Sequence, residues 1–170
     1  MSYEGLPVEP VRTLLAFQRR RREWEFVDVR DCTKLAKVRH SADLTGVIEL
    51  TVGQVSLLGP SWESDIELLW LSVADLVASY RRDGRAEVSF PDQPADITLE
   101  PVPPGLIRIT VAGGPYRETA VTGEERLLSA LAAGGVEFFE KFAELTGRNF
   151  DRGIRKLTGR TASGRTGPSA

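Results

Sequence analysis

The sequence predicts a single α+β domain in which an antiparallel sheet of about six to seven strands has two main helices packed on one face. Three observations predict it. Two segments carry apolar residues at steps of three and four, and several short alternating runs are separated by glycine and proline. The 170 residues, 41% of them hydrophobic, are enough for one core. We expect the domain to span residues 1–157 and residues 158–170, which have no apolar anchor, to form a disordered tail.

The first forty residues predict a helix, a strand and a loop. Pro10 suits the first position of an amphipathic helix over about residues 10–21. Residues 24–29 mix aromatic and β-branched side chains with acidic ones, which is typical of a half-buried strand. Residues 31–43 are polar and mixed, and we expect a loop there with at most one helical turn.

The next segment predicts two strands and the clearest helix of the chain. Alternating residues over 47–58 are interrupted at Gly53, which indicates a turn or bulge between two strands. Ser64 and Glu67 match a capping box, so a helix is expected over residues 64–82. Its apolar face would comprise Ile66, Leu69, Trp70, Val73, Leu76, Val77 and Tyr80.

The second half predicts a meander followed by a long helix. Short alternating runs over residues 85–121, separated by proline and glycine, predict four consecutive antiparallel strands. Thr122 and Glu125 match a second capping box, which would open a helix over residues 122–147. Gly134 and Gly135 within that helix suggest a close backbone contact or a bend, and residues 149–157 suggest one more amphipathic turn. The expected core contains Trp70, Val73, Val77, Val88, Phe90, Ile97, Ile107, Ile109, Phe138 and Phe142.

Charge is unevenly distributed, although the net charge is only −2. Residues 1–40 carry +3, residues 41–147 carry −10 and residues 148–170 carry +5. An acidic body disfavours nucleic acid and favours a basic protein partner. With no signal peptide pattern and no run of about 18 apolar residues, we expect a cytoplasmic protein without a membrane contact.

The residues required by the common catalytic and metal sites are scarce. One cysteine and one histidine exclude an intramolecular disulfide and the zinc sites with four cysteines or with two cysteines and two histidines. A Cys32–His40 dyad would lack an orienting third group, and no phosphate-binding glycine loop or nucleophile elbow occurs. We therefore expect no enzymatic activity and no cofactor.

Two charged groups have simpler explanations than a site. Asp92 and Asp96 resemble a carboxylate pair, but aspartates in a proline-bounded turn usually satisfy nearby backbone groups. The run Arg19–Arg22 would contact phosphates together with Arg152, Arg155, Arg160 and Arg165, or would complement the dipole at the end of the first helix. The second explanation is favoured because no aromatic residues are interleaved with the run.

Trp62 is the strongest candidate for a binding residue. It follows Gly59 and Pro60 and is itself followed by Glu63, Asp65 and Glu67, and an aromatic anchor surrounded by charge is typical of protein interfaces. The simpler alternative is a tryptophan packed over a helix start, with carboxylates that suit the helix dipole.

The order of motifs resembles that of small actinobacterial α+β proteins, many without an assigned role and some similar to immunity proteins encoded beside polymorphic toxins. The residues concerned are Trp-Glu-Ser-Asp before a helix ending in Tyr-Arg-Arg-Asp-Gly, then Glu-Val-Ser-Phe-Pro-Asp-Gln-Pro, Ile-Thr-Leu, and a long helix with Phe-Phe. The resemblance covers about residues 24–147, rests on pattern, and transfers no catalytic residue. It implies a non-enzymatic protein-binding module that neutralises a basic toxin through an acidic surface. A self-associating accessory protein and a nucleic-acid binder with basic termini remain the alternatives.

Overall fold

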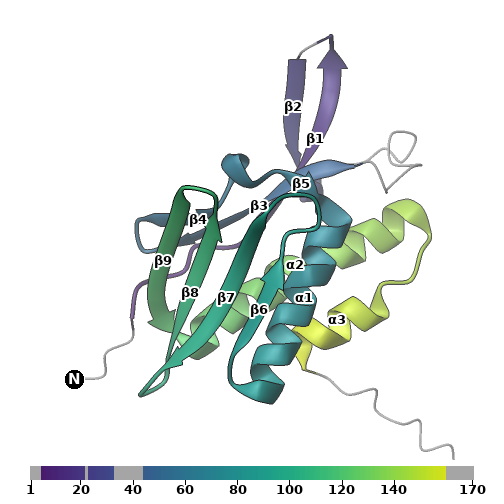
Figure 1. The fold of residues 1–170 in the computed structure, drawn as a ribbon. Coiled ribbons are helices and arrows are strands. Elements are labelled where there is room, and N and C mark those ends of the chain that lie inside the picture. The colour runs from purple at the N-terminus through teal and green to yellow at the C-terminus, as the bar shows by residue number, and fades with distance from the viewer. Residues whose placement is uncertain (1–4, 22, 33–43, 160–170) are drawn as a thin grey trace, which may run out of the picture.

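The computed structural model of the chain describes residues 5–21, 23–32 and 44–159, and it contains two antiparallel sheets and three α-helices (Figure 1). The first sheet comprises β1 (Arg12–Arg20), β2 (Glu23–Asp28), β3 (Thr45–Val52) and β4 (Val55–Leu58) in the order β2-β1-β3-β4, and the short β5 (Ser64–Asp65) pairs with β3. The second sheet is a meander of β6 (Ala86–Ser89), β7 (Ala95–Val102), β8 (Leu106–Gly113) and β9 (Tyr116–Gly123). The chain is therefore one α+β domain, but with two sheets in place of the single one expected.

The N-terminal segment joins the two sheets. Gly5 forms an isolated bridge with Thr122 of β9, and Val8 forms another with Val52 of β3. The Thr122 hydroxyl also donates a hydrogen bond to the Leu6 carbonyl. The edge strands β4 and β9 contact each other but are not paired, so the two sheets remain separate.

The expected helix over residues 10–21 is wrong, because this segment is strand β1, which pairs with both β2 and β3. Beyond the body of the molecule β1 and β2 continue as a projecting hairpin (Figure 1). The strand at residues 24–29 is confirmed as β2, and the turn at Gly53 is confirmed by its positive φ of 60° between β3 and β4. A 3-10 helix, η1 (Val29–Asp31), follows β2.

Helices α1 (Ile66–Asp83) and α2 (Glu124–Thr146) pack on the same face of the second sheet (Figure 1). α1 contacts β6 and β7, while α2 contacts β8 and β9. The third helix, α3 (Asp151–Thr158), is longer than the single turn expected and packs against both α1 and α2. No helix in the described part of the chain is long and apolar enough to cross a membrane.

Neither expected capping box forms. The N-cap of α1 is Asp65, whose carboxylate accepts a hydrogen bond from the Leu68 N–H at 3.0 Å, while Ser64 belongs to β5. The N-cap of α2 is Gly123, which has no capping side chain, because Thr122 is still within β9. In both cases pairing in a sheet holds the serine or threonine one position too early to cap the helix.

The core lies between the helices and the inner faces of the two sheets. Of the ten residues expected there, nine are buried and Val88 is partly buried against the others. Trp70 and Phe138 are fully buried and stack with ring centroids 6.1 Å apart. Burial of these large rings is worth on the order of 1.5–3 kcal/mol each.

Candidate functional site

The strongest candidate site surrounds a short 3-10 helix, η4 (Pro60–Trp62), which connects β4 to β5. Pro60 occupies its first turn, and the Trp62 N–H donates to the Gly59 carbonyl at 2.9 Å. This tight turn holds the indole of Trp62 against the second sheet, where it stacks on Phe90 with centroids 5.3 Å apart and an interplanar angle of 27°. η4 therefore places a half-buried tryptophan at the seam between the two sheets.

Tyr116 completes an aromatic corner at this seam. Its ring lies 6.4 Å from that of Trp62 at an angle of 82°, and 68% of Tyr116 is exposed. Side chains on β9 alternate between faces, so Tyr116 and Glu118 point in the same direction as the buried Ala120. The first half of β9 extends past the buried part of the sheet. Tyr116 and Glu118 are therefore exposed, although they lie on the face of β9 that is buried at Ala120.

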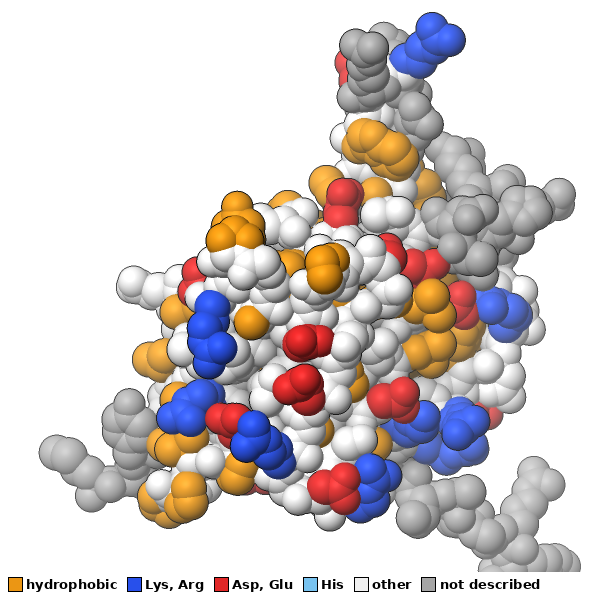
Figure 2. Space-filling model, viewed as in Figure 1, with side chains coloured by type: hydrophobic (Ala, Val, Ile, Leu, Met, Phe, Trp, Pro, Cys, Tyr) orange, Lys and Arg blue, Asp and Glu red, His pale blue; other side chains and the backbone are white. Residues whose placement is uncertain are grey.

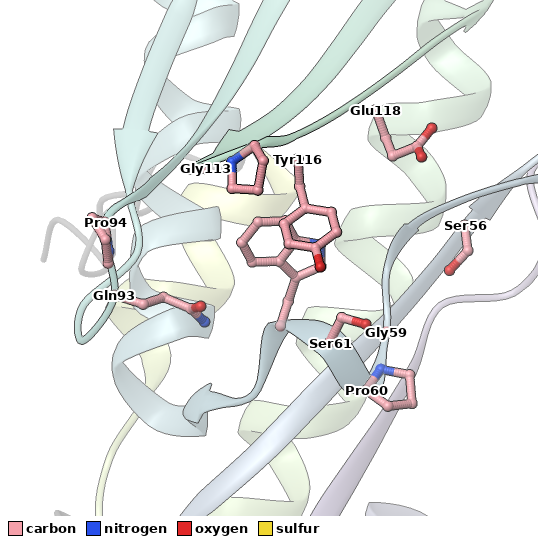
Figure 3. Close-up of a pocket in the computed structure, with 12 residues that line it drawn as sticks. Ser56, Gly59, Pro60, Ser61, Gln93, Pro94, Gly113, Tyr116 and Glu118 are labelled. Carbon is pink, nitrogen blue, oxygen red and sulfur yellow. The ribbon is translucent and has the colours of Figure 1, made fainter.

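The corner forms one wall of a half-open pocket of about 620 Å³. Figure 3 shows Glu118 and Ser56 on one side of Tyr116, with Gln93 and Pro94 on the other. The remaining lining residues are Gly59, Pro60, Ser61, Trp62, Gly113, Gly114 and Pro115. The pocket is thus built from β4, η4, the β6–β7 turn and the β8–β9 hairpin.

A second hollow, of about 460 Å³, lies on the other side of Pro60. Trp24 and Phe26 of the projecting hairpin line it together with Thr45 and Glu63. Trp24 is 59% exposed and Phe26 is 40% exposed, and both lie on the same face of β2. Figure 2 shows hydrophobic side chains on the hairpin and on the end of the body beneath it.

The two hollows share Pro60 as a lining residue. We define the aromatic surface as the residues Trp24, Phe26, Pro60, Trp62, Glu63, Tyr116 and Glu118. Glu63 and Glu118 are the charged side chains among the described residues that line the hollows, and no lysine or arginine is among them. The surface is therefore apolar with an acidic rim.

The four residues singled out from the sequence have different positions. Trp62 lies in the first pocket and Glu63 in the second hollow. Asp65 caps α1, and Glu67, only 9% exposed, forms an ion pair with Arg148 at 2.7 Å. Two of the three carboxylates therefore have structural partners.

Four further residues line the hollows although the sequence did not single them out as binding residues: Trp24, Phe26, Tyr116 and Glu118. Two aromatic residues at i and i+2 among acidic neighbours indicate an exposed face of a strand, and this signal was present at Trp24 and Phe26. Tyr116 directly follows Gly113-Gly114-Pro115, where a tight turn exposes the next side chain. Nothing in the sequence indicated that these distant segments meet.

The other candidates from the sequence do not form a site in the described residues. Cys32 is buried, whereas His40 lies outside the described residues, as do Arg160 and Arg165. Among the residues described, no group of three or more His, Cys, Asp or Glu side chains is arranged to hold a metal ion. Arg19 and Arg20 are in β1 and Arg21 is in the hairpin turn, so the explanation by a helix dipole is wrong.

The two turn aspartates make separate local contacts. Asp92 accepts hydrogen bonds from the Ser64 hydroxyl at 2.6 Å and the Asp65 N–H at 3.0 Å. Asp96 accepts one from the Ser89 hydroxyl at 2.7 Å. Asp92 thereby ties the β6–β7 turn to the start of α1, next to the first pocket.

The carboxyl group of Asp28, at the end of β2, has a lowered pKa. Partial burial of Asp28 alone would raise its pKa, but hydrogen bonds from the Arg30 side chain and backbone, together with the charge of Arg30, outweigh burial and lower the pKa below its ordinary value. Asp28 also caps η1. We interpret this shift as part of the anchoring of the hairpin base.

Comparison with known proteins adds no relative from which a role could be transferred: no family model, no curated protein and no solved structure matches the chain.

Proposed function

We propose that the protein is a non-enzymatic binding module that holds a basic protein partner on its aromatic surface. One observation carries the proposal: Trp24, Phe26, Trp62 and Tyr116, from segments far apart in the sequence, line two hollows that share Pro60, and the charged residues of both linings are carboxylates. If the resemblance to toxin-immunity proteins holds, the partner is a basic toxin domain.

The composition of this surface supports a protein as the ligand. Tryptophan, tyrosine and phenylalanine are enriched at interface cores because they bury a large area at a small cost in conformational entropy. Exposing several of them together is unfavourable in a free monomer, and such patches mark interaction sites. The exposed fractions of Trp24 and Tyr116, 59% and 68%, are therefore the feature that a partner would remove.

The rim charge supports a basic partner. Glu63 and Glu118 would attract a cationic face, and complementary charge accelerates encounter and sets specificity. The same carboxylates would repel phosphates, which disfavours nucleic acid at this surface.

Self-association is the second candidate because β2 is an edge strand of its sheet in the described residues. The sequence of β2, Glu-Trp-Glu-Phe-Val-Asp, counts against pairing with a second copy. In the centred antiparallel register Glu23 would face Asp28 of the other copy, and like charges opposite each other are destabilising. Light scattering after size exclusion distinguishes a monomer from a dimer.

The test is affinity capture from the organism that encodes the protein, with variants as parallel baits. Trp24→Ala and Tyr116→Ala each remove one exposed ring, while Leu68→Ala removes an exposed apolar side chain on α1 as the matched control. The proposal expects a protein retained by the wild type and by Leu68→Ala but lost by both other baits. The product of the adjacent gene is tested first.

Kinetics with the purified partner then separate charge from apolar contact. Reversing Glu63 and Glu118 to Lys should slow association and reduce its salt dependence, whereas Trp62→Ala should accelerate dissociation by a factor equivalent to about 2 kcal/mol. A partner that binds the Trp24, Trp62 and Tyr116 variants as tightly as the wild type would overturn the proposed surface. A stable homodimer that buries the same residues would replace the proposal by self-association.

A further inference from the structure

We infer that the pocket beside Trp62 receives an arginine side chain. The inference rests on the proposed function, in that the arginine belongs to the protein partner, and it specifies the chemistry that this one pocket recognises.

The aromatic corner supplies attraction for a cation. The rings of Trp62 and Tyr116 are nearly perpendicular, at 82°, so they bound the pocket on two sides. A guanidinium group within about 6 Å of such a ring is attracted by the negative charge of the ring face. Because Phe90 stacks on Trp62, the tryptophan side of the corner is held in place.

Two polar side chains of the pocket offer hydrogen-bond acceptors to a cation. Glu118 offers a carboxylate on one side of Tyr116 (Figure 3). On the other side, the Gln93 amide nitrogen donates to the Glu63 carbonyl at 2.8 Å and to the Ser64 hydroxyl at 3.2 Å. Only the NH₂ group can donate to a carbonyl, so this bond fixes the amide orientation and leaves the Gln93 carbonyl oxygen as an acceptor.

Arginine fits these groups better than other side chains. A guanidinium has five N–H donors and no acceptor, so it complements a site with a carboxylate and an amide oxygen and without a lysine or arginine in its lining. It is planar and stacks on aromatic rings, whereas an ammonium group is more strongly hydrated and would lose more on entering a half-open pocket. A neutral side chain of the same shape would lack the attraction to the rings and to Glu118.

The experiment uses the peptide Ac-Gly-Arg-Gly-NH₂ as the probe and the full chain as the receptor. Its citrulline analogue is the neutral control of the same shape, and its lysine analogue is the second cation. Two-dimensional ¹H–¹⁵N NMR follows the indole N–H of Trp62, assigned with Trp62→Phe, and the backbone amides of Gly113, Gly114 and Tyr116. We expect saturable shifts at these positions with a Kd in the millimolar range for arginine, weaker ones for lysine and none for citrulline.

Variants assign the interaction to the pocket. Glu118→Gln should raise the Kd about threefold or more, and Tyr116→Ala about fivefold or more. Glu125→Gln is the matched control, because it removes the same charge from an exposed position in the first turn of α2 and should leave the Kd unchanged. Circular dichroism of each variant confirms that the fold is intact.

Three results would overturn the inference: equal shifts from the arginine and citrulline peptides, shifts that do not saturate or that spread over many carboxylates, and an unchanged Kd in both Glu118→Gln and Tyr116→Ala. These results leave the proposed function standing if a partner is still captured through Trp24 and Tyr116. Conversely, arginine binding without any captured partner retains the pocket and removes the protein-binding role.

Discussion

The three carboxylates after Trp62 have different roles because each has a different neighbour. Glu63 is exposed in the second hollow, Asp65 accepts a hydrogen bond from a backbone N–H of α1, and Glu67 is nearly buried against Arg148. Only Glu63 can meet a partner without disturbing the fold. Charge reversal at Asp65 would therefore test the helix cap as well as binding.

We predict that Arg148→Met destabilises the protein by about 1.5–3 kcal/mol, the range for hydrogen bonds to charged groups. The substitution leaves the Glu67 carboxylate, 9% exposed, without its cation. The cost stays below that of breaking a fully buried pair because the Arg148 side chain is 47% exposed. Urea denaturation measures it, with Glu63→Gln as the control that should change stability by less than about 0.5 kcal/mol. Equal stability of the two variants would contradict a structural role for Glu67.

At the scale of elements, the two central glycines of α2 allow close packing against neighbouring segments. A Cβ on Gly135 would lie 2.3 Å from the Leu157 side chain and 2.8 Å from the Trp70 ring, and one on Gly134 would lie 2.8 Å from Val11. The expectation of close contact from the sequence is thus confirmed. Gly135 lets α2 reach both α1 and α3.

We predict that Gly135→Ala lowers the stability, although helix propensity by itself would raise it by about 1 kcal/mol. The added methyl group meets fully buried Trp70 and Leu157, and overpacking of this kind costs about 1–3 kcal/mol. Ala133→Gly, at an exposed position of the same helix, is the control and should cost about 1 kcal/mol by propensity. Thermal melts of the two variants and the wild type measure these effects. An increase in Tm for Gly135→Ala would rule out the close contact at Gly135.

For the molecule as a whole, α3 secures the outer surface of the two long helices. Leu157 is fully buried, Lys156 forms an ion pair with Asp75 at 2.5 Å, and Arg81 donates to the Leu157 carbonyl at 2.5 Å. The end of α3 is therefore anchored by one buried side chain and by polar contacts to α1. The domain boundary expected at residue 157 falls within the last turn of α3, because α3 includes Thr158. Of the tail expected over residues 158–170, residues 160–170 lie outside the described residues.

We predict that a chain ending at Phe150 melts several degrees lower than the full chain. Loss of α3 exposes the surfaces of α1 and α2 that Leu157 covers, and each kcal/mol of stability corresponds to about 2–4 °C in a chain of this size. A chain ending at Gly159 retains every contact that the structure describes for α3 and should melt with the full chain. If both truncations melt alike, α3 contributes nothing to the stability of the body.

The sequence by itself determined the elements whose pattern is local. The amphipathic stripe of α1, the stripe of α2 and the proline- and glycine-separated runs of β6–β9 predicted those elements and nine buried core residues, because side-chain periodicity follows directly from backbone geometry. Trp62 also stood out from its local context.

Tertiary structure decided what depends on distant partners. β1 has apolar residues at helical spacing, yet it is a strand. Its inward-facing residues include Thr13, which is only 1% exposed. Thr13 can be buried because its hydroxyl accepts a hydrogen bond from the Trp70 indole N–H at 3.0 Å. Local pattern counts threonine as polar and so favoured a helix. The aromatic surface depends on contacts of the same kind, since Trp24, Trp62 and Tyr116 come together only through the pairing of β1 with β3 and the approach of β4 to β9. Such contacts are fixed by packing energies between segments far apart in the chain, and no local spacing encodes them.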